Sequence, residues 1–319
     1  MPSNWIFWLL FNAFVLAMLA LDLGIFHRKK HVVLFKEAIG WTIVWVSLAA
    51  VFAAFIYFWG HTLVGHLGRP NRELSLEFIT GYLIEESLSV DNLFVFLLIF
   101  RYFQVPRHNQ HSVLFWGVVG ALVMRAIFIF AGIALLKRFE WVIYIFGAIL
   151  IYSGIKLFGQ QDQKIEPEKN IVLRAFRNLF PVTTSYEDDR FFVRKRGILF
   201  ATPLAIVLIV IETTDLLFAT DSIPAVLAVT REPFIVYTSN VFAILGLRSL
   251  YFALAGMIDA FHFLHYGLSL ILIFIGVKMI ASHYVKVPIG IALGVVAGVL
   301  LLSVVGSLLF PRHVAAEGK

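Results

Sequence analysis

Long apolar runs separated by short polar segments account for almost the whole chain. A membrane-spanning helix needs roughly 20 mostly apolar residues. Nine runs approach that length, near residues 5–26, 38–59, 77–100, 113–136, 141–158, 199–221, 235–257, 264–283 and 287–310. The pattern predicts an all-α, polytopic membrane protein with about nine transmembrane helices, in which residues 1–319 form a single transmembrane domain.

The first run predicts a retained span. Its positive cluster follows the apolar residues, and no small-residue cleavage site is present. A secretory signal peptide shows the opposite arrangement of charge and ends in such a site.

Composition agrees with a membrane protein and limits the chemistry. Hydrophobic residues make up 60% of the chain, charged residues 14%, and the mean hydropathy is +0.88. Since cysteine is absent, any metal must bind through oxygen or nitrogen. We expect no tightly bound cofactor and no enzymatic activity. The net charge of +6 lies mainly in short loops, where membrane orientation and contact with anionic lipid explain it without nucleic acid.

Lysine and arginine predict the orientation of the spans. If the chain alternates from an outside N-terminus, 17 of these residues fall on the inside and six on the outside. Positive residues accumulate on the cytoplasmic side of membrane proteins. We therefore expect a multi-pass protein of the bacterial inner membrane, with the N-terminus outside and the C-terminus in the cytoplasm. An odd number of spans agrees.

The longest polar stretch, residues 159–198, divides the chain in two and falls on the positive side. Within it, "NIVLRAFRNLF" places Val172, Ala175, Phe176 and Leu179 at helical spacing. This spacing is typical of a short amphipathic helix on the membrane surface. A linker helix that merely packs against the protein explains it equally well.

The two parts of the chain repeat one another. Polar residues follow one another in the same order within three successive spans of each part, as Asp91, Arg125, Lys156 and then Asp215, Arg248, Lys278. The offsets between them are 124, 123 and 122 residues. Because three is an odd number of spans, the two copies must enter the membrane from opposite sides, which is the inverted-repeat plan of many secondary transporters.

This repeat divides the transporter domain into five parts. They are two leading spans in 1–76, repeat 1 with spans 3–5 in 77–158, a cytoplasmic loop with an amphipathic helix in 159–198, repeat 2 with spans 6–8 in 199–283, and the final span and tail in 284–319.

Acidic residues outnumber basic ones inside the spans by seven to three. The acids are Asp22, Glu85, Glu86, Asp91, Glu212, Asp215 and Asp221, and the bases are Arg125, Arg248 and Lys278. A charge at the centre of a lipid-facing helix costs about 3 kcal/mol, so these groups must face a polar interior. The surplus of acids leaves room for a bound cation or for protons. Interhelical salt bridges alone are the alternative.

Helical geometry groups the polar residues into stripes. Glu85, Ser89 and Asn92 share one face, and Glu212, Asp215 and Ser222 share another. Asp91 lies about 120° from Glu85 and Asp221 about 180° from Glu212 on an ideal wheel, so a bend or a neighbouring helix must complete the site.

Proline supplies a bend in the second repeat. Pro224 cannot donate a hydrogen bond to the carbonyl of Thr220, which predicts an interrupted helix with free carbonyls near Ala219 and Thr220. Carboxylate, carboxamide, hydroxyl and carbonyl oxygens suit a hard divalent ion. Oxygen ligands alone leave Mn²⁺, Mg²⁺ and Ca²⁺ open.

Several motifs together resemble one family. "GYLIEESLSVDN", "ATDSIPAVLAVT" and "SNVFAILGLRSLYF", with "LALDLGIFHRKK" in the first span, are similar to the TerC family of bacterial membrane proteins and its Alx-like branch. The resemblance covers nearly the whole chain. It implies an inner-membrane protein of manganese homeostasis that exports Mn²⁺, with links to tellurium resistance and to a redox or alkaline-pH response. The acids of the family's two signature spans match Glu85, Asp91, Asn92, Glu212, Asp215 and Asp221.

The resulting hypothesis is a transporter with a carboxylate site at the membrane midplane. Its first expected ligands are Asp91 and Asp215, followed by Glu85, Asn92, Glu212 and Asp221. Arg125, Arg248, Lys278 and Asp22 balance the charge, and proton coupling is open. A non-transporting scaffold or redox and tellurite-stress protein is the main alternative. An intramembrane aspartyl protease is disfavoured, since the chain has no GxGD stretch. Oligomeric state is left open.

Overall fold

The computed structural model describes residues 5–26, 35–64, 69–159, 170–195, 197–255, 263–285 and 287–309, with the side chains of the first helix described as far as residue 21. Ten helices and two short strands make up the described chain. They are α1 (Trp5–Phe26), α2 (Phe35–Val64), α3 (Asn71–Tyr102), α4 (Arg107–Arg138), α5 (Val142–Gly159), α6 (Ile171–Leu179), β1 (Phe192–Lys195), β2 (Ile198–Ala201), α7 (Pro203–Leu227), α8 (Pro233–Leu254), α9 (Leu264–Ala281) and α10 (Ile289–Leu309).

Each of the nine apolar runs forms a helix. Within the described residues, seven helices are long and apolar enough to cross a membrane, namely α2, α4, α5, α7, α8, α9 and α10. The apolar part of α1 with described side chains, Trp5–Leu21, is shorter. Helix α3 has the length but contains the acidic residues of the first signature motif. A polytopic, helical membrane protein is therefore confirmed.

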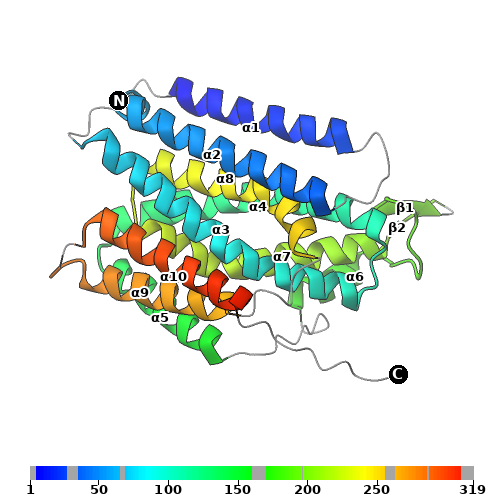
Figure 1. The fold of residues 1–319 in the computed structure, drawn as a ribbon. Helices are drawn as coiled ribbons and strands as arrows, with labels where there is room; N and C mark the ends of the chain where they lie inside the picture. Colours follow the sequence, from blue (N-terminus) through cyan, green and yellow to red (C-terminus); the bar gives the residue numbers. More distant parts are fainter. Residues whose placement is uncertain are drawn as a thin grey trace.

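The helices run roughly alongside one another (Figure 1). Helices α3, α4, α7 and α8 contact one another in the interior, and α2 packs against α3 and α8. Helix α10 packs against α3 and α9, and α9 packs along α5. Large apolar side chains on the outer helices are exposed, including Leu16, Tyr152 and Leu302. Lipid is the environment that makes such exposure favourable.

Helix α8 is the most enclosed element, because nearly every residue from Phe234 to Leu247 is buried. Aromatic rings attach α1 and α2 to it. Phe11 of α1 and Phe52 of α2 both contact Phe242 of α8, with ring centroids 5.8 and 5.0 Å apart. These tilted ring contacts add to simple apolar burial.

Helices α5 and α9 approach closely at glycines. A Cβ atom at Gly154 would lie 2.8 Å from the carbonyl oxygen of Ser269, and one at Gly276 would lie 2.7 Å from that of Gly147. No side chain fits at such distances, so glycine is required for this contact.

A β-hairpin precedes α7, which the all-α expectation missed. β1 and β2 pair antiparallel, with Lys195 opposite Ile198 and Gly197 at a φ of +82° in the turn. The predicted span at 199–221 therefore begins later, at Pro203. Figure 1 shows the hairpin and α6 at one end of the bundle. They are attached there through Tyr186, whose hydroxyl donates to the carbonyl of Phe103 at 2.6 Å.

The short helix at 170–180 is present, but its buried residue differs from the expectation. Leu173 is buried, whereas Val172 and Leu179 of the predicted apolar face are exposed. Asn170 caps the helix by accepting from the backbone nitrogen of Leu173 at 3.1 Å. The same side chain donates to Thr213 of α7 at 2.7 Å, which fixes α6 to the bundle.

Pro224 does not interrupt α7, contrary to the sequence-based expectation. The helix continues through it and ends at Leu227. Pro224 lies in the last turn, where one hydrogen bond is lost and neighbouring helices hold the backbone in place. A distinct kink occurs instead in α2 at Trp59, with φ −124° and ψ 16°, where the second apolar run ends.

Candidate functional site

A buried arginine lies at the centre of the four interior helices. Arg125 stands midway along α4 and is 1% exposed. Its guanidinium forms ion pairs with Glu85 of α3 and with Asp215 of α7, the latter at 3.3 Å. It also donates to the Asn240 carboxamide oxygen of α8 at 3.5 Å. Four helices thus contribute one polar group each to this centre.

Neighbouring groups orient the members of this centre. Asn240 donates from its amide nitrogen to the carbonyl of Val236 at 3.0 Å, which directs its oxygen toward Arg125. Glu85 and Asp215 are almost fully buried. Buried charges are tolerated only when paired, so removal of one partner leaves a costly uncompensated charge.

The predicted stripe on α3 is buried along its length. Glu85 and Ser89 are fully buried and Asn92 nearly so. Among the described residues, neither the Ser89 hydroxyl oxygen nor the Asn92 amide nitrogen has a hydrogen-bond partner. Buried polar atoms without partners are uncommon and indicate a place for water or an ion.

Helix α7 brings a second carboxylate beside the centre. The Glu212 carboxylate occupies the position where a Cβ atom of Gly120 would stand. It also interacts electrostatically with Asp215, one helical turn away. The glycine on α4 therefore makes room for an acidic group next to an ion pair.

Asp221 lies apart from this group, as its position on the helical wheel predicted. It accepts a hydrogen bond from the Ser153 hydroxyl of α5 at 2.6 Å and interacts electrostatically with Lys156. Helix α5 is thus the neighbouring element that completes its surroundings.

Asp91 is half-buried on α3 and is not among the ion-pair partners of Arg125. Within the described ranges, no group of three or more histidine, aspartate or glutamate side chains is arranged to hold a metal ion. In this conformation the structure joins Glu85 and Asp215 through Arg125 and leaves Asp91 and Asp221 at separate positions.

The expected charge-balancing residues occupy different surroundings. Arg248 is buried beside Met18, Trp45 and Phe115. Lys278 lies at the end of α9, where it donates to the carbonyl of Ala228 at 3.5 Å. The side chain of Asp22 lies outside the described residues.

Two polar features were not anticipated. Asn240 belongs to the centre, and its signal was a carboxamide within an otherwise apolar span. Glu77, near the start of α3, is buried and forms an ion pair with Arg69. Arg69, Glu73 and Glu77 recur every fourth residue, which is the spacing of pairs on one helical face.

These features define a polytopic helical membrane protein with a charged centre among its interior helices. The chain belongs to the TerC family: residues 71–315 match the "Integral membrane protein TerC family". No solved structure matches the chain.

Named relatives cover almost the full length. The chain is 52% identical to "Uncharacterized membrane protein STKORF319" of Myxococcus xanthus, over 96% of this chain and 93% of the relative. It is 48% identical to "Putative membrane-bound redox modulator Alx" of Salmonella typhi and 47% identical to the Escherichia coli K12 protein of that name, over 92% of this chain and 91% of each relative. The Alx-like resemblance is therefore confirmed.

Proposed function

We propose that this protein exports a divalent metal cation, Mn²⁺ foremost, across the bacterial inner membrane. The proposed route passes through the centre formed by α3, α4, α7 and α8. One observation carries the proposal: the Arg125 guanidinium, buried midway along α4, is held by carboxylates from two other helices. Glu85 and Asp215 thus already bind one cation, the guanidinium of Arg125.

Charge balance supplies a mechanism. Two ionised carboxylates, Glu85 and Asp215, face one guanidinium, so the group carries a surplus of one negative charge that a proton neutralises. A divalent cation neutralises both carboxylates without the guanidinium. The displaced guanidinium then needs a third carboxylate, which Glu212 beside Asp215 would supply on losing its own proton. Entry of the metal would therefore release two protons and displace Arg125 toward Asn240, its other partner. Metal and proton movement are coupled in this scheme.

Further oxygen atoms are available along the same face. The second Asp215 oxygen has no hydrogen-bond partner among the described residues, nor has the Ser89 hydroxyl. Glu212 lies next to Asp215, and Asn92 continues the α3 stripe. Such oxygen-rich sites favour Mn²⁺, Mg²⁺ or Ca²⁺ over zinc or copper. We choose Mn²⁺ because of the family resemblance.

We also propose that α3–α5 and α7–α9 are inverted repeats within a nine-span bundle. A twofold relation maps the α3–α8 contact onto the α7–α4 contact, and both pairs of helices pack together. It maps α5 and α9 onto each other. Shifted by 122 residues, the contact of Gly154 with Ser269 becomes the contact of Gly276 with Gly147. These equivalent contacts support the repeat.

The proposed orientation places the hairpin end of the bundle in the cytoplasm. That end contains the segment 170–195, which carries Arg174, Arg177, Arg190, Arg194 and Lys195. The N-terminus would then lie outside and the C-terminus inside. Cysteines introduced at Ser185 and Asn71 of this cysteine-free chain test the orientation, since an impermeant reagent added outside should label only the second.

Transport into liposomes tests the function. Purified protein should move Mn²⁺ across the bilayer, with Mg²⁺ and Ca²⁺ as competitors, and Mn²⁺ uptake should alkalinise the lumen, because the scheme moves protons in the opposite direction. Asp215→Asn should abolish the flux, because it removes an anionic ligand at nearly constant volume. Glu187→Gln, in the segment before β1, is the matched acid-to-amide control and should leave the flux unchanged. Absence of Mn²⁺ flux in the unmodified protein would refute the proposal.

A second candidate is a non-transporting scaffold or a redox and tellurite-stress protein. The relatives named as membrane-bound redox modulators favour it. Because this chain has no cysteine, it would have to act without thiol chemistry of its own. Altered cellular redox state with no change in Mn²⁺ flux would favour this candidate over export.

A further inference from the structure

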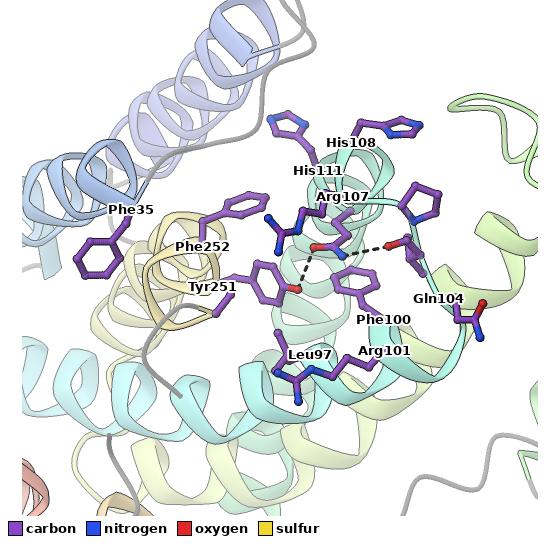
Figure 2. Close-up of a pocket in the computed structure, with 14 residues that line it drawn as sticks. Phe35, Leu97, Phe100, Arg101, Gln104, Arg107, His108, His111, Tyr251 and Phe252 are labelled. Carbon is purple, nitrogen blue, oxygen red and sulfur yellow. Dashed lines mark hydrogen bonds between the residues drawn. The ribbon is translucent and has the colours of Figure 1, made fainter. Parts of the chain in front are cut away.

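A cavity of about 650 Å³ opens at the hairpin end of the bundle, away from the mid-membrane acids. It lies between the end of α3, the start of α4 and the end of α8, with Phe35 of α2 at one side (Figure 2). None of Glu85, Asp91, Glu212 or Asp215 lines it. Its position at the helix ends corresponds to the level of lipid headgroups.

The charge of the lining is one-sided. Arg101 from the last turn of α3 and Arg107 from the first turn of α4 both line the cavity, together with His108 and His111. Among the described residues of the lining there is no aspartate or glutamate. Among the described residues, neither arginine forms an ion pair with an acid. The cavity therefore offers positive charge that the described protein does not neutralise.

A fixed polar wall accompanies these charges. The Tyr251 hydroxyl donates to the Gln110 side-chain oxygen at 3.1 Å, and the Gln110 amide donates to the carbonyl of Val105 at 3.1 Å. Both arginines act electrostatically on Tyr251, so the two charges converge on this wall. Figure 2 shows Arg107, Tyr251 and Phe252 grouped around the same space.

The start of α4 adds a further attraction for anions. Pro106 caps this 32-residue helix and provides no side-chain acceptor for the first amide groups. A helix N-terminus carries partial positive charge and free amide donors, and it binds phosphate readily. Arginine adds planar, charge-assisted hydrogen bonds to phosphate oxygens.

We propose that this cavity binds a phosphate group through Arg101, Arg107 and the start of α4. Two sources share this chemistry: the headgroup of an anionic phospholipid, and free phosphate. The site is independent of the metal centre, and its occupancy does not require that the protein transport Mn²⁺.

Binding to the purified full chain tests the proposal. After removal of native lipid in neutral detergent, the protein is titrated with dioleoyl phosphatidylglycerol, with dioleoyl phosphatidylcholine and with inorganic phosphate, and its thermal unfolding and native mass are recorded. The test variant is Arg101→Gln with Arg107→Gln. The matched control, Lys137→Gln with Arg138→Gln, removes two positive charges from the opposite end of α4. Each single arginine variant is measured in case the double variant unfolds.

We expect affinity for the phosphate-bearing probe to fall roughly tenfold or more for each arginine removed. The control should bind as the unmodified protein does. Saturable binding of phosphatidylglycerol, with no effect of phosphatidylcholine or inorganic phosphate, assigns a lipid headgroup. Competition by inorganic phosphate assigns the free anion. Equal binding by the arginine variants and the control, or no binding of either anion, would overturn the proposal.

Discussion

Arg125 and Arg248 occupy equivalent places in the two proposed repeats but have different surroundings. Both are buried and lie on the second helix of their repeat. Arg125 contacts Glu85 of α3 and Asp215 of α7, whereas Arg248 pairs with neither of these acids and lies next to α1 and α2, near Met18 and Trp45. The leading helices lie outside the repeats and pack on α8. They therefore distinguish two halves that the sequence presents as alike, and only one arginine joins the charged centre.

The largest expected difference comes from removing each arginine. Arg125→Gln leaves Glu85 and Asp215 buried without a cation, which should cost about 3–5 kcal/mol of unfolding free energy. Arg248→Gln should leave Mn²⁺ affinity unchanged, because Arg248 does not contact either carboxylate. Unfolding in mixed micelles and Mn²⁺ titration measure the two effects. Equal loss of Mn²⁺ binding in both variants would contradict the distinction.

The next largest difference is expected between Asp91 and Asp215, the acids that the proposed repeat relates. Asp215→Asn weakens a buried ion pair and should cost about 1.5–3 kcal/mol, in addition to abolishing transport. Asp91→Asn should reduce Mn²⁺ flux less than Asp215→Asn does, and at little cost in stability, because Asp91 lies apart from the centre, is half-buried and is not a partner of Arg125.

A triple variant separates the structural role of Glu85 and Asp215 from their ligand role. In Glu85→Gln with Asp215→Asn and Arg125→Gln, accumulation of the protein should recover because none of the three buried charges remains. Transport should stay absent. Recovered Mn²⁺ flux would mean that the two acids serve only the ion pairs.

The α5–α9 pair provides the opposite case, in which the two proposed repeats have similar contacts. Gly154→Ala and Gly276→Ala should destabilise the protein to the same extent, by about 1–3 kcal/mol, because each methyl group meets a backbone carbonyl that cannot yield. Gly294→Ala of α10 is the control, since nothing lies within 4 Å of that position. Unequal costs at Gly154 and Gly276 would argue against a twofold relation.

A smaller change can make the first repeat resemble the second. The offset of 123 residues places Ala243 opposite Gly120, so Gly120→Ala installs the residue that repeat 2 already has. The new methyl group should displace the Glu212 carboxylate, whose flexible side chain limits the stability cost to about 1 kcal/mol. Weaker Mn²⁺ affinity with retained stability is the expected readout, and unchanged affinity would remove Glu212 from the site.

The smallest effect is expected at the exposed ion pair of the hairpin. The Lys195 ammonium lies 2.6 Å from the Glu187 carboxylate and holds the pKa of that carboxyl below its ordinary value of 4.5. A lowered folded-state pKa contributes stability above the unfolded value and loses it as pH falls through the folded value. Lys195→Gln should leave the thermal midpoint at pH 7 nearly unchanged, because exposed pairs contribute little. A large shift of the thermal midpoint would contradict this expectation, because it would show that the exposed pair contributes substantially to stability.

The spans were predictable because a membrane leaves the backbone few alternatives. A helix satisfies its own backbone hydrogen bonds within the membrane, so long apolar runs such as 113–136 and 235–257 predict helices directly. The hairpin was missed because β1 and β2 have four residues each, too few for an alternating pattern to stand out. Gly197, which has positive φ in the turn, was the available signal.

The sequence predicted which face of each helix carries the polar residues of the site, but it did not predict which helices would contact one another there. The stripe of Glu85, Ser89 and Asn92 follows from helical periodicity within one element, and it is buried as expected. Which helix Arg125 would face depends on the packing of α4 between α7 and α8, which the order of residues does not specify. Tertiary packing therefore pairs Arg125 with Glu85 and Asp215. The order of residues along the chain does not identify these two partners.

Location of bound Mn²⁺ by anomalous scattering tests the central claim most directly. In protein saturated with Mn²⁺, we predict a peak within about 2–2.6 Å of carboxylate oxygens of Glu85 and Asp215, with the Arg125 guanidinium withdrawn toward Asn240. An Mn²⁺-saturated structure in which Arg125 still bridges Glu85 and Asp215, with no anomalous peak among α3, α4, α7 and α8, would contradict the account.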